Sequence, residues 1–227
     1  MSRTAVVTGS ASGIGAAIAS ALERDGWTVA GLDAKLAAPY GVDTSDPAAV
    51  SEALSRIADD IGPIDAVVSA AGHYDMTPVS QITPEQLRRM LRVHLGGLRN
   101  LARSVLPSMI SRRRGAIVAI TSELAIGGGD GDAHYAAAKG AVIGLVRSLA
   151  AEVAQHGVRV NGVAPGPTDT PLLSADSPWR APEYLRTLPN RRLTRPDEIA
   201  RVVQFLLDDD AAFCTGEIIS PNSGAVI

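Results

Sequence analysis

The sequence predicts an α/β protein, a doubly wound parallel sheet of about seven strands, with residues 1–227 forming a single domain. Short apolar runs alternate with longer segments in which apolar residues recur every three to four positions, and this alternation is typical of βαβ units. The runs are almost continuously apolar, as expected of strands covered on both faces. A length of 227 residues suits one large domain.

Six apolar runs are predicted to be strands: Ala5–Thr8, Thr28–Leu32, Ala66–Ser69, Ala116–Thr121, Val158–Val163 and Glu217–Ser220. The connection from Leu32 to Asp43 is too short for a full crossover helix. We expect a brief seventh strand near Val42 instead.

Three of the connecting segments carry clear helix signals. One begins at a cap formed by Ser45 or Asp46, with Pro47 in its first turn. A long helix is predicted to begin at Thr83 or Pro84 and to end near Ser111, and another covers Ala133–Val153.

Composition excludes several classes of protein. Hydrophobic residues make up 46% and charged residues 20% of the chain, which is typical of a packed globular protein. A formal net charge of −3 gives no general attraction to nucleic acid or to anionic membranes. The single cysteine, Cys214, allows no intrachain disulfide, and the first apolar run, Ala5 to Val7, is too short for a signal peptide or a membrane span. We expect a cytoplasmic protein without nucleic-acid or membrane partners and without a metal.

A glycine-rich turn follows the first predicted strand. The segment Thr8–Gly15 has glycine at positions 9, 13 and 15 and leads into a helical pattern. Glycine lets a pyrophosphate approach the backbone, and the helix N-terminus supplies N–H donors and partial positive charge. A tight strand-to-helix connection without a ligand is the alternative. The position at the first βα junction favours a dinucleotide site of the Rossmann type.

Asp33 ends the second predicted strand, 18 residues after Gly15. Dinucleotide sites place an acidic residue about 20 residues on, where it accepts hydrogen bonds from the adenosine ribose. A carboxylate there repels a 2′-phosphate, and the neighbouring Ser12 and Ala34 are neutral. Lys35 is the one basic residue close by, and a simple turn role for Asp33 is the alternative. The pattern favours NAD over NADP.

Tyr135 and Lys139 lie four residues apart in the predicted helix Ala133–Val153, so their side chains share one face. An ammonium group close to a phenol lowers the phenol pKa from its usual value of about 10. Lys139 is one of only two lysines among 21 basic residues, the other being Lys35. A surface pair of ordinary helix residues is the alternative, but a retained lysine points to a need for its titratable amine.

These motifs, in this order, resemble those of the short-chain dehydrogenase/reductase family, and the resemblance covers nearly the whole chain. Ser122, at the end of a predicted strand, matches the family's catalytic serine, and Ser69-Ala70-Ala71-Gly72 stands where the family has Asn-Asn-Ala-Gly. Further matches are Val42-Asp43 near the adenine, Pro165–Thr170 on the nicotinamide side, Arg195–Ala200 in a C-terminal helix, and Thr215–Glu217 before the last strand.

The resemblance implies an oxidoreductase that transfers a hydride between a nicotinamide cofactor and a secondary alcohol or ketone. It implies that Tyr135 is the general acid or base, that Lys139 lowers the Tyr135 pKa and binds the nicotinamide ribose, and that Ser122 orients the reacting oxygen. It implies the following cofactor contacts: Gly9, Ser12, Gly13, Ile14, Gly15, Asp33, Val42, Asp43, Ala70, Ala71, Gly72, Tyr135, Lys139, Pro165, Gly166, Thr168 and Thr170.

The chain departs from the family pattern at two positions. Ser69 replaces the first asparagine of the Asn-Asn-Ala-Gly motif, a change that a strand edge tolerates. His94 stands where the family has a catalytic asparagine in the long helix, and it falls on the apolar stripe of that helix. His94 is either a buried core histidine or a replacement for the asparagine that relays protons through water to Lys139.

The substrate is expected at the C-terminal ends of the strands. The predicted lining segments are 72–76, 124–134 and a lid near 172–190, in which Trp179, Arg180, Tyr184 and Arg186 suit either a ring or carboxylated substrate or a solvated surface. The short connection after Asp33 and the string Pro165–Thr170 resemble dihydrodiol dehydrogenases of the 2,3-dihydro-2,3-dihydroxybenzoate type.

Other functions stay open at this point. They are a 3-oxoacyl-thioester reductase, a nicotinamide-binding regulator or scaffold with weak or lost catalysis, and a non-redox member of the fold. Small residues in the helix Ala133–Val153, among them Ala136, Ala137 and Gly140, favour close helix packing between subunits. The family resemblance therefore implies a homotetramer.

Overall fold

The computed structural model describes residues 2–35 and 41–227. Its centre is a parallel sheet with the order β2-β1-β3-β4-β5-β6. The strands are β1 (Thr4–Thr8), β2 (Thr28–Leu32), β3 (Ala66–Ser69), β4 (Gly115–Ile120), β5 (Val158–Val163) and β6 (Ile218–Ile219). The order reverses between β1 and β3, which creates the crevice where doubly wound sheets bind ligands.

The prediction of a seventh strand near Val42 is wrong for the described part of the chain. Residues 41–46 form no strand, although Val42 is buried in the core cluster beneath the sheet. Val42 therefore contributes an apolar side chain without pairing its backbone, and β2 is the edge strand of the sheet that the described residues form. Part of the connection from Leu32 to Asp43, residues 36–40, lies outside the described residues.

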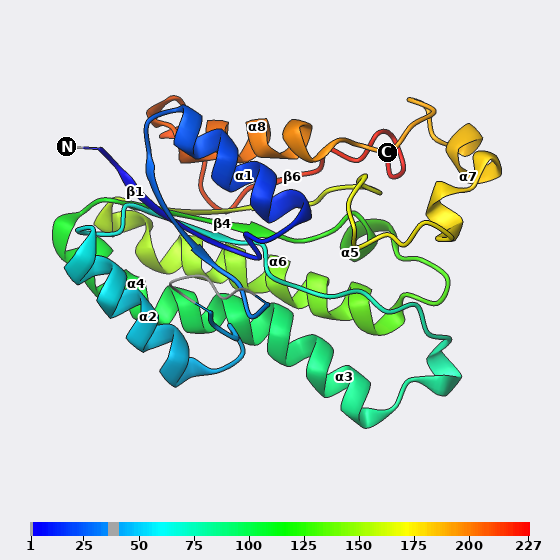
Figure 1. Cartoon of the computed structure of the whole chain (residues 1–227), viewed down its shortest axis with the longest axis horizontal. Helices are drawn as coiled ribbons and strands as arrows, with labels where there is room; N and C mark the ends of the chain where they lie inside the picture. The colour runs from blue at the N-terminus through cyan, green and yellow to red at the C-terminus, as the bar shows by residue number, and fades with distance from the viewer. Residues whose placement is uncertain (1, 36–40) are drawn as a thin grey trace.

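Helices cover both faces of the sheet (Figure 1). α2 (Pro47–Asp60), α4 (Gly97–Arg112) and α6 (Ala133–Val153) pack against one face. α1 (Gly13–Arg24) and α8 (Pro196–Leu207) pack against the other. Side chains from both faces of β1, β3 and β4 are fully buried, which accounts for their continuous apolar sequences.

The predicted helix starts agree with the caps. Asp46 accepts hydrogen bonds from the N–H groups of Ala48 and Ala49, with Pro47 in the first turn of α2. Thr83 and Gln86 form a capping box at the start of α3 (Pro84–Leu91).

The long predicted helix is continuous but not uniform. α3 runs into a π-helical turn, η2 (Arg92–Gly96), and then into α4. Single π-helical turns occur often at functional sites, because they rotate the following residues relative to a regular helix. Here the π turn carries His94, the residue that replaces the family asparagine.

The remaining short elements lie mainly where the strands end. α5 (Leu124–Gly127) and α7 (Pro182–Thr187) lie at the end of the sheet away from the N-terminus (Figure 1). The 3₁₀ turns are η1 (Val79–Gln81), η3 (Ala154–His156), η4 (Pro178–Arg180) and η5 (Asp209–Ala211). Among the described residues, none of the helices has both the length and the apolar character needed to cross a bilayer.

Candidate active site

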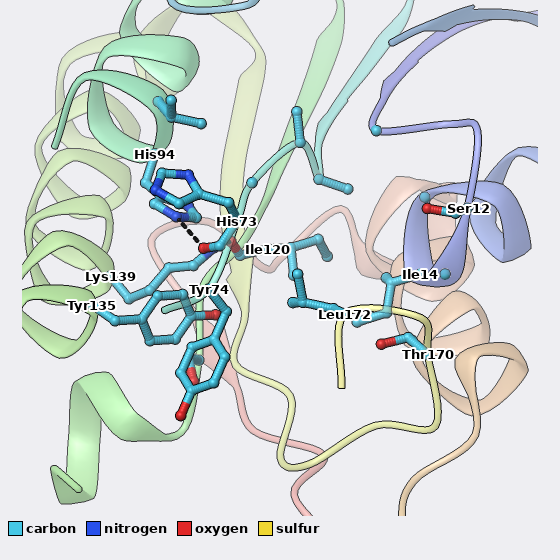
Figure 2. A pocket seen from close by; sticks show the side chains of 18 of the residues that line it. Ser12, Ile14, His73, Tyr74, His94, Ile120, Tyr135, Lys139, Thr170 and Leu172 are labelled. Carbon is cyan, nitrogen blue, oxygen red and sulfur yellow. Dashed lines mark hydrogen bonds between the residues drawn. The ribbon is translucent and has the colours of Figure 1, made fainter. Parts of the chain in front are cut away.

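A cavity of about 480 Å³ opens at the carboxyl ends of the strands. Every residue that the sequence nominated for catalysis or cofactor binding lines it, from the glycine turn at one end to His94, Tyr135 and Lys139 at the other. Figure 2 shows this arrangement, with Ser12, Ile14 and Thr170 across the cavity from the tyrosine, lysine and histidine side chains. One continuous space therefore joins the two motifs.

The glycine turn is shaped by contacts that a side chain would break. Gly9 has a φ of 69°, and a Cβ there would lie 3.0 Å from the backbone of Ala70 and Ala71. A Cβ at Gly15 would collide with the carbonyl of Gly9. Ser12 caps α1 without a side-chain hydrogen bond, so it leaves the first N–H groups of the helix to bind an anion. The turn thus fits a pyrophosphate.

Thr8 ties this turn to the strand beside it. Its hydroxyl accepts hydrogen bonds from the N–H groups of Ala70 and Ala71, each at 3.0 Å. It is also 3.4 Å from the carbonyl of Val68, to which it donates. The segment that replaces Asn-Asn-Ala-Gly is therefore held by a threonine that sequence reasoning gave no separate role.

Asp33 lies beside the glycine turn at the same end of the cavity, directly after β2. Its two carboxylate oxygens accept hydrogen bonds from the N–H groups of Ala11, at 3.1 Å, and Lys35, at 2.8 Å. Each oxygen keeps a further lone pair, so the carboxylate retains the capacity to accept from a ribose hydroxyl.

Lys139 is buried, and its amine points into the site. The Nζ atom donates to the carbonyl of Ile120 at 2.8 Å and lies 5.7 Å from the centre of the Tyr135 ring. Burial lowers the pKa of Lys139 to about 7. The hydroxyl of Thr121 donates to the Lys139 carbonyl, which anchors α6 against β4 at this point.

Tyr135 is also buried, and its protonation differs from the expectation. Its pKa lies above the usual value, mainly because burial disfavours the phenolate and because the Glu123 carboxyl is close. A hydrogen bond with Ser122 opposes the rise. The lowering expected from Lys139 is not seen among the protein groups, because burial moves the lysine itself toward its neutral form.

Glu123 is a site residue that the sequence analysis missed. The hydroxyl of Ser122 donates to Glu123 Oε2 at 2.9 Å, and the N–H of Leu124 donates to Ser122 Oγ at 3.2 Å. Burial raises the pKa of Glu123 to about 7. The sequence could have indicated this role, because Glu123 directly follows the serine at the end of a buried strand, where a carboxylate is seldom found. The predicted lining segment, however, began one residue later, at Leu124.

His94 is buried and faces the site, as its place on the apolar stripe predicts. Its Nε2 lies 2.9 Å from the carbonyl of His73, and a carbonyl only accepts, so Nε2 carries the proton. Nδ1 is then an acceptor, and it finds no protein partner among the described residues. Burial and Lys139 lower the pKa of His94 to about 2, so the ring is neutral.

The substrate end is walled by aromatic rings. Tyr74 lies edge-on to Tyr135, with 5.1 Å between ring centres. The Tyr74 hydroxyl donates to Asp132 at 2.7 Å and accepts from the indole N–H of Trp179 at 3.1 Å. Trp179 in turn meets Tyr184 of α7. The segment expected to be a lid is thus joined to the cavity wall.

Both arginines of this segment are engaged elsewhere. Arg180 forms an ion pair with Asp169 at 2.7 Å and also donates to the carbonyls of Thr170 and Leu173. Arg186 is exposed and pairs with Glu183. These contacts fit the solvated or structural interpretation of the two arginines better than a carboxylate-binding one.

The proteins that this chain resembles are reductases and other oxidoreductases, as the residues of the site predict. Residues 9–225 match a family model described as enoyl-(acyl carrier protein) reductase. The acetoacetyl-CoA reductase of Shinella zoogloeoides is 38% identical, over 99% of this chain and 98% of that protein. The uncharacterized oxidoreductase YmfI of Bacillus subtilis (strain 168) is 34% identical, over 99% of both chains.

A solved structure of a dehydrogenase is also similar to this chain over nearly its whole length. The ligand-free aldohexose dehydrogenase AldT of Thermoplasma acidophilum superposes with a TM-score of 0.91 at 30% identity, covering 98% of this chain and 93% of that one. The chain belongs to the short-chain dehydrogenase/reductase family and is an oxidoreductase of that family. The fold and family resemblance predicted from the sequence are thereby confirmed.

Proposed function

We propose that this protein is an NAD-dependent dehydrogenase or reductase that acts on a secondary alcohol or ketone with Tyr135 as general acid or base. The observation that carries the proposal is the meeting of Ser122, Tyr135 and Lys139 in the same cavity as the glycine turn. A non-redox protein has no need for all four features in one space. Their retention also argues against a regulator or scaffold that has lost chemistry.

The residues present fit a nicotinamide dinucleotide. The free N–H groups at the start of α1 suit the pyrophosphate, and Asp33 suits the adenosine ribose. Thr168 and Thr170 line the cavity on the side where the family holds the carboxamide. The bound nicotinamide supplies or accepts the hydride. The carboxylate of Asp33, without a basic residue at position 12 or 34, supports NAD rather than NADP.

The proposed chemistry assigns one task to each side chain. In reduction, Tyr135 gives its phenolic proton to the carbonyl oxygen, and in oxidation its phenolate takes the alcohol proton. Lys139 favours the phenolate when charged and replaces the proton that Tyr135 has given up. His94 keeps the neutral Nδ1 acceptor available to a water molecule on the path to Lys139.

Relatives favour a second candidate activity, reduction of a 3-oxoacyl thioester. The acetoacetyl-CoA reductase named above is one such relative, and the 3-oxoacyl-(acyl-carrier-protein) reductase FabG of Thermotoga maritima is 32% identical over 99% of this chain and 98% of that protein. Dihydrodiols and aldohexoses remain alternative substrates within the same reaction class.

Steady-state assays with NADH or NAD⁺ distinguish these substrates. We would test acetoacetyl-CoA, aldohexoses, cyclic dihydrodiols and hydroxysteroids in both directions, with Tyr135→Phe as the inactive control. Turnover of at least one substrate that disappears in the variant supports the proposal. Cofactor binding without turnover of any substrate class would instead support the regulator.

We also propose that the protein acts as a cytoplasmic homotetramer. Ala137 and Gly144 are exposed on α6, and a Cβ built at Gly140 or Gly144 meets nothing within 4 Å. Such a flat helix surface suits close packing against a second α6. The single cysteine, Cys214, is free and buried, which fits a reducing compartment. Light scattering at micromolar concentration tests the assembly, and a monomer would contradict it.

A further inference from the structure

The hydroxyl of Ser122 is committed to a neighbour within the site. A serine hydroxyl has one proton to donate and two lone pairs to accept with. That proton is directed to Glu123 Oε2, and the N–H of Leu124 occupies one lone pair. Ser122 and Glu123 are both buried and both line the cavity. With its proton directed to Glu123, Ser122 can only accept on its cavity side, including in its hydrogen bond with Tyr135.

This arrangement conflicts with the reaction, if the proposed function is correct. The reacting oxygen carries partial negative charge in the transition state, in whichever direction the hydride moves. Ser122 stabilises that charge only by donating its proton to the oxygen. An ionised carboxylate accepts hydrogen bonds and donates none, so it competes for the same proton. A protonated carboxyl can donate to Ser122 Oγ and release the serine proton.

We propose that Glu123 is a positioning residue whose protonated carboxyl donates to Ser122 Oγ, so that Ser122 donates to the reacting oxygen, and whose ionisation turns the serine proton away. The hydride and the Tyr135 proton move as in the proposed function. Glu123 neither gains nor loses a proton during turnover and acts only through Ser122 and through its charge.

The surroundings of Glu123 support this role. Titratable groups interact with it from three directions: Asp132 and Tyr135 at the start of α6, Tyr74 from the segment after β3, and Tyr184 from α7. All four are acidic, and the proximity of Asp132, like burial, favours the protonated form of Glu123. Hydrogen bonds from Ser122 and from backbone N–H groups favour the ionised form. The pKa of Glu123 is about 7, so both forms occur near neutral pH.

Glu123→Gln tests the proposal, because a glutamine amide does not titrate and has N–H groups to donate to Ser122. For a ketone whose reduction depends on Tyr135, we expect wild-type kcat to fall as the pH rises above about 7. At about pH 9, two units higher, the Glu123→Gln variant is expected to exceed the wild type by about tenfold or more. Glu85→Gln, which removes an exposed carboxylate on α3, is the matched control and should keep the wild-type profile.

Infrared spectroscopy of the cofactor-free protein gives an independent measurement. We expect a protonated-carboxyl stretch that disappears as the pH rises through about 7, that is absent in Glu123→Gln, and that shifts in frequency in Ser122→Ala. An alkaline limb that persists in an active Glu123→Gln variant, or a carboxyl band unaffected by Ser122→Ala, would overturn the inference. If no ketone is reduced, the proposed function fails, while the infrared comparison still decides whether Glu123 and Ser122 are coupled.

Discussion

The two ends of the cavity are built in different ways. At the cofactor end, backbone groups form most of the surface: the turn around Gly9, the N-terminus of α1 and the loop that is hydrogen-bonded to Asp33. At the substrate end, side chains form the surface: His94, Glu123, Tyr74 and Trp179 line the cavity from four separate segments. Backbone-built sites tolerate little sequence change, because their shape depends on where glycine stands. Side-chain-built sites can be altered one residue at a time without changing the fold.

The largest effect is expected at Tyr135, at the substrate end of the cavity. Tyr135→Phe keeps the ring that packs against Tyr74 and His94 but removes the proton carrier. We expect kcat to fall by about 10²–10⁴-fold, the usual range for loss of a general acid. NADH binding, followed by fluorescence titration, should change little.

Retained activity in Tyr135→Phe would indicate a different acid. His73 and His134 are the first residues to examine, since both are close to the site and have ring nitrogens without hydrogen-bond partners among the described residues. More than a few per cent of wild-type kcat would require such a substitute.

A glycine pair tests whether the cofactor end depends on backbone shape. Gly9 and Gly26 both have positive φ, at 69° and 79°, but only at Gly9 would a Cβ meet other atoms, those of Ala70 and Ala71. We expect Gly9→Val to reduce NADH affinity by about 100-fold or more and to destabilise the protein by about 1–3 kcal/mol. Gly26→Val carries similar backbone strain away from the site and should lower only the stability, measured by urea unfolding.

The sequence predicted correctly those features that depend on local backbone geometry. The glycine turn at Thr8–Gly15, a cap at Ser45 or Asp46 and the i, i+4 pair Tyr135 and Lys139 each follow from local geometry, and all three were predicted; the structure has the positive φ at Gly9 and the cap at Asp46. Prediction from the sequence failed where tertiary contacts decide. Val42 is apolar and buried, yet whether it pairs in a strand depends on space beside β2, which no local pattern reports.

At the substrate end, too, contacts between distant parts of the chain limit what the sequence predicts. The bond between Ser122 and Glu123 joins neighbours in sequence, but the rise in the Glu123 pKa comes from burial by distant elements. The contact of Trp179 with Tyr74 joins residues 105 positions apart. The pKa of Tyr135 was expected to be lowered by Lys139 together with a bound oxidised nicotinamide, whereas among the protein groups burial and Glu123 raise it.

His94 tests the substrate end by replacement with the family residue. His94→Asn should keep most of the activity, because an amide N–H can still donate to the His73 carbonyl and an amide oxygen can accept in place of Nδ1. His94→Leu loses both groups and should reduce kcat by about 10–100-fold, a share of a general acid–base contribution.

The protonation state of His94 also determines what is expected on the acid side of the pH profile. An imidazole that titrates near its usual pKa would add a second ionisation to the oxidative profile. Burial and Lys139 lower the His94 pKa to about 2, so the wild type and His94→Asn should share the same acid limb. If His94→Leu matches the wild type in kcat and in profile, the histidine only fills the core.

The smallest effect is expected at Asp33, because it changes the choice of cofactor rather than the chemistry. Asp33→Ser removes the charge that favours a ribose hydroxyl and repels a 2′-phosphate, and we expect the preference for NADH over NADPH to fall by about tenfold, or about 1.4 kcal/mol. Asp33→Asn is the matched variant, since its amide oxygen still accepts from one of the two N–H groups that Asp33 binds at Ala11 and Lys35. If charge decides, both variants lose the preference, whereas if the loop shape decides, only Asp33→Ser does. Competing dissociation constants from fluorescence titration separate these outcomes, and equal or tighter NADPH binding by the wild type would show that the carboxylate does not select the cofactor.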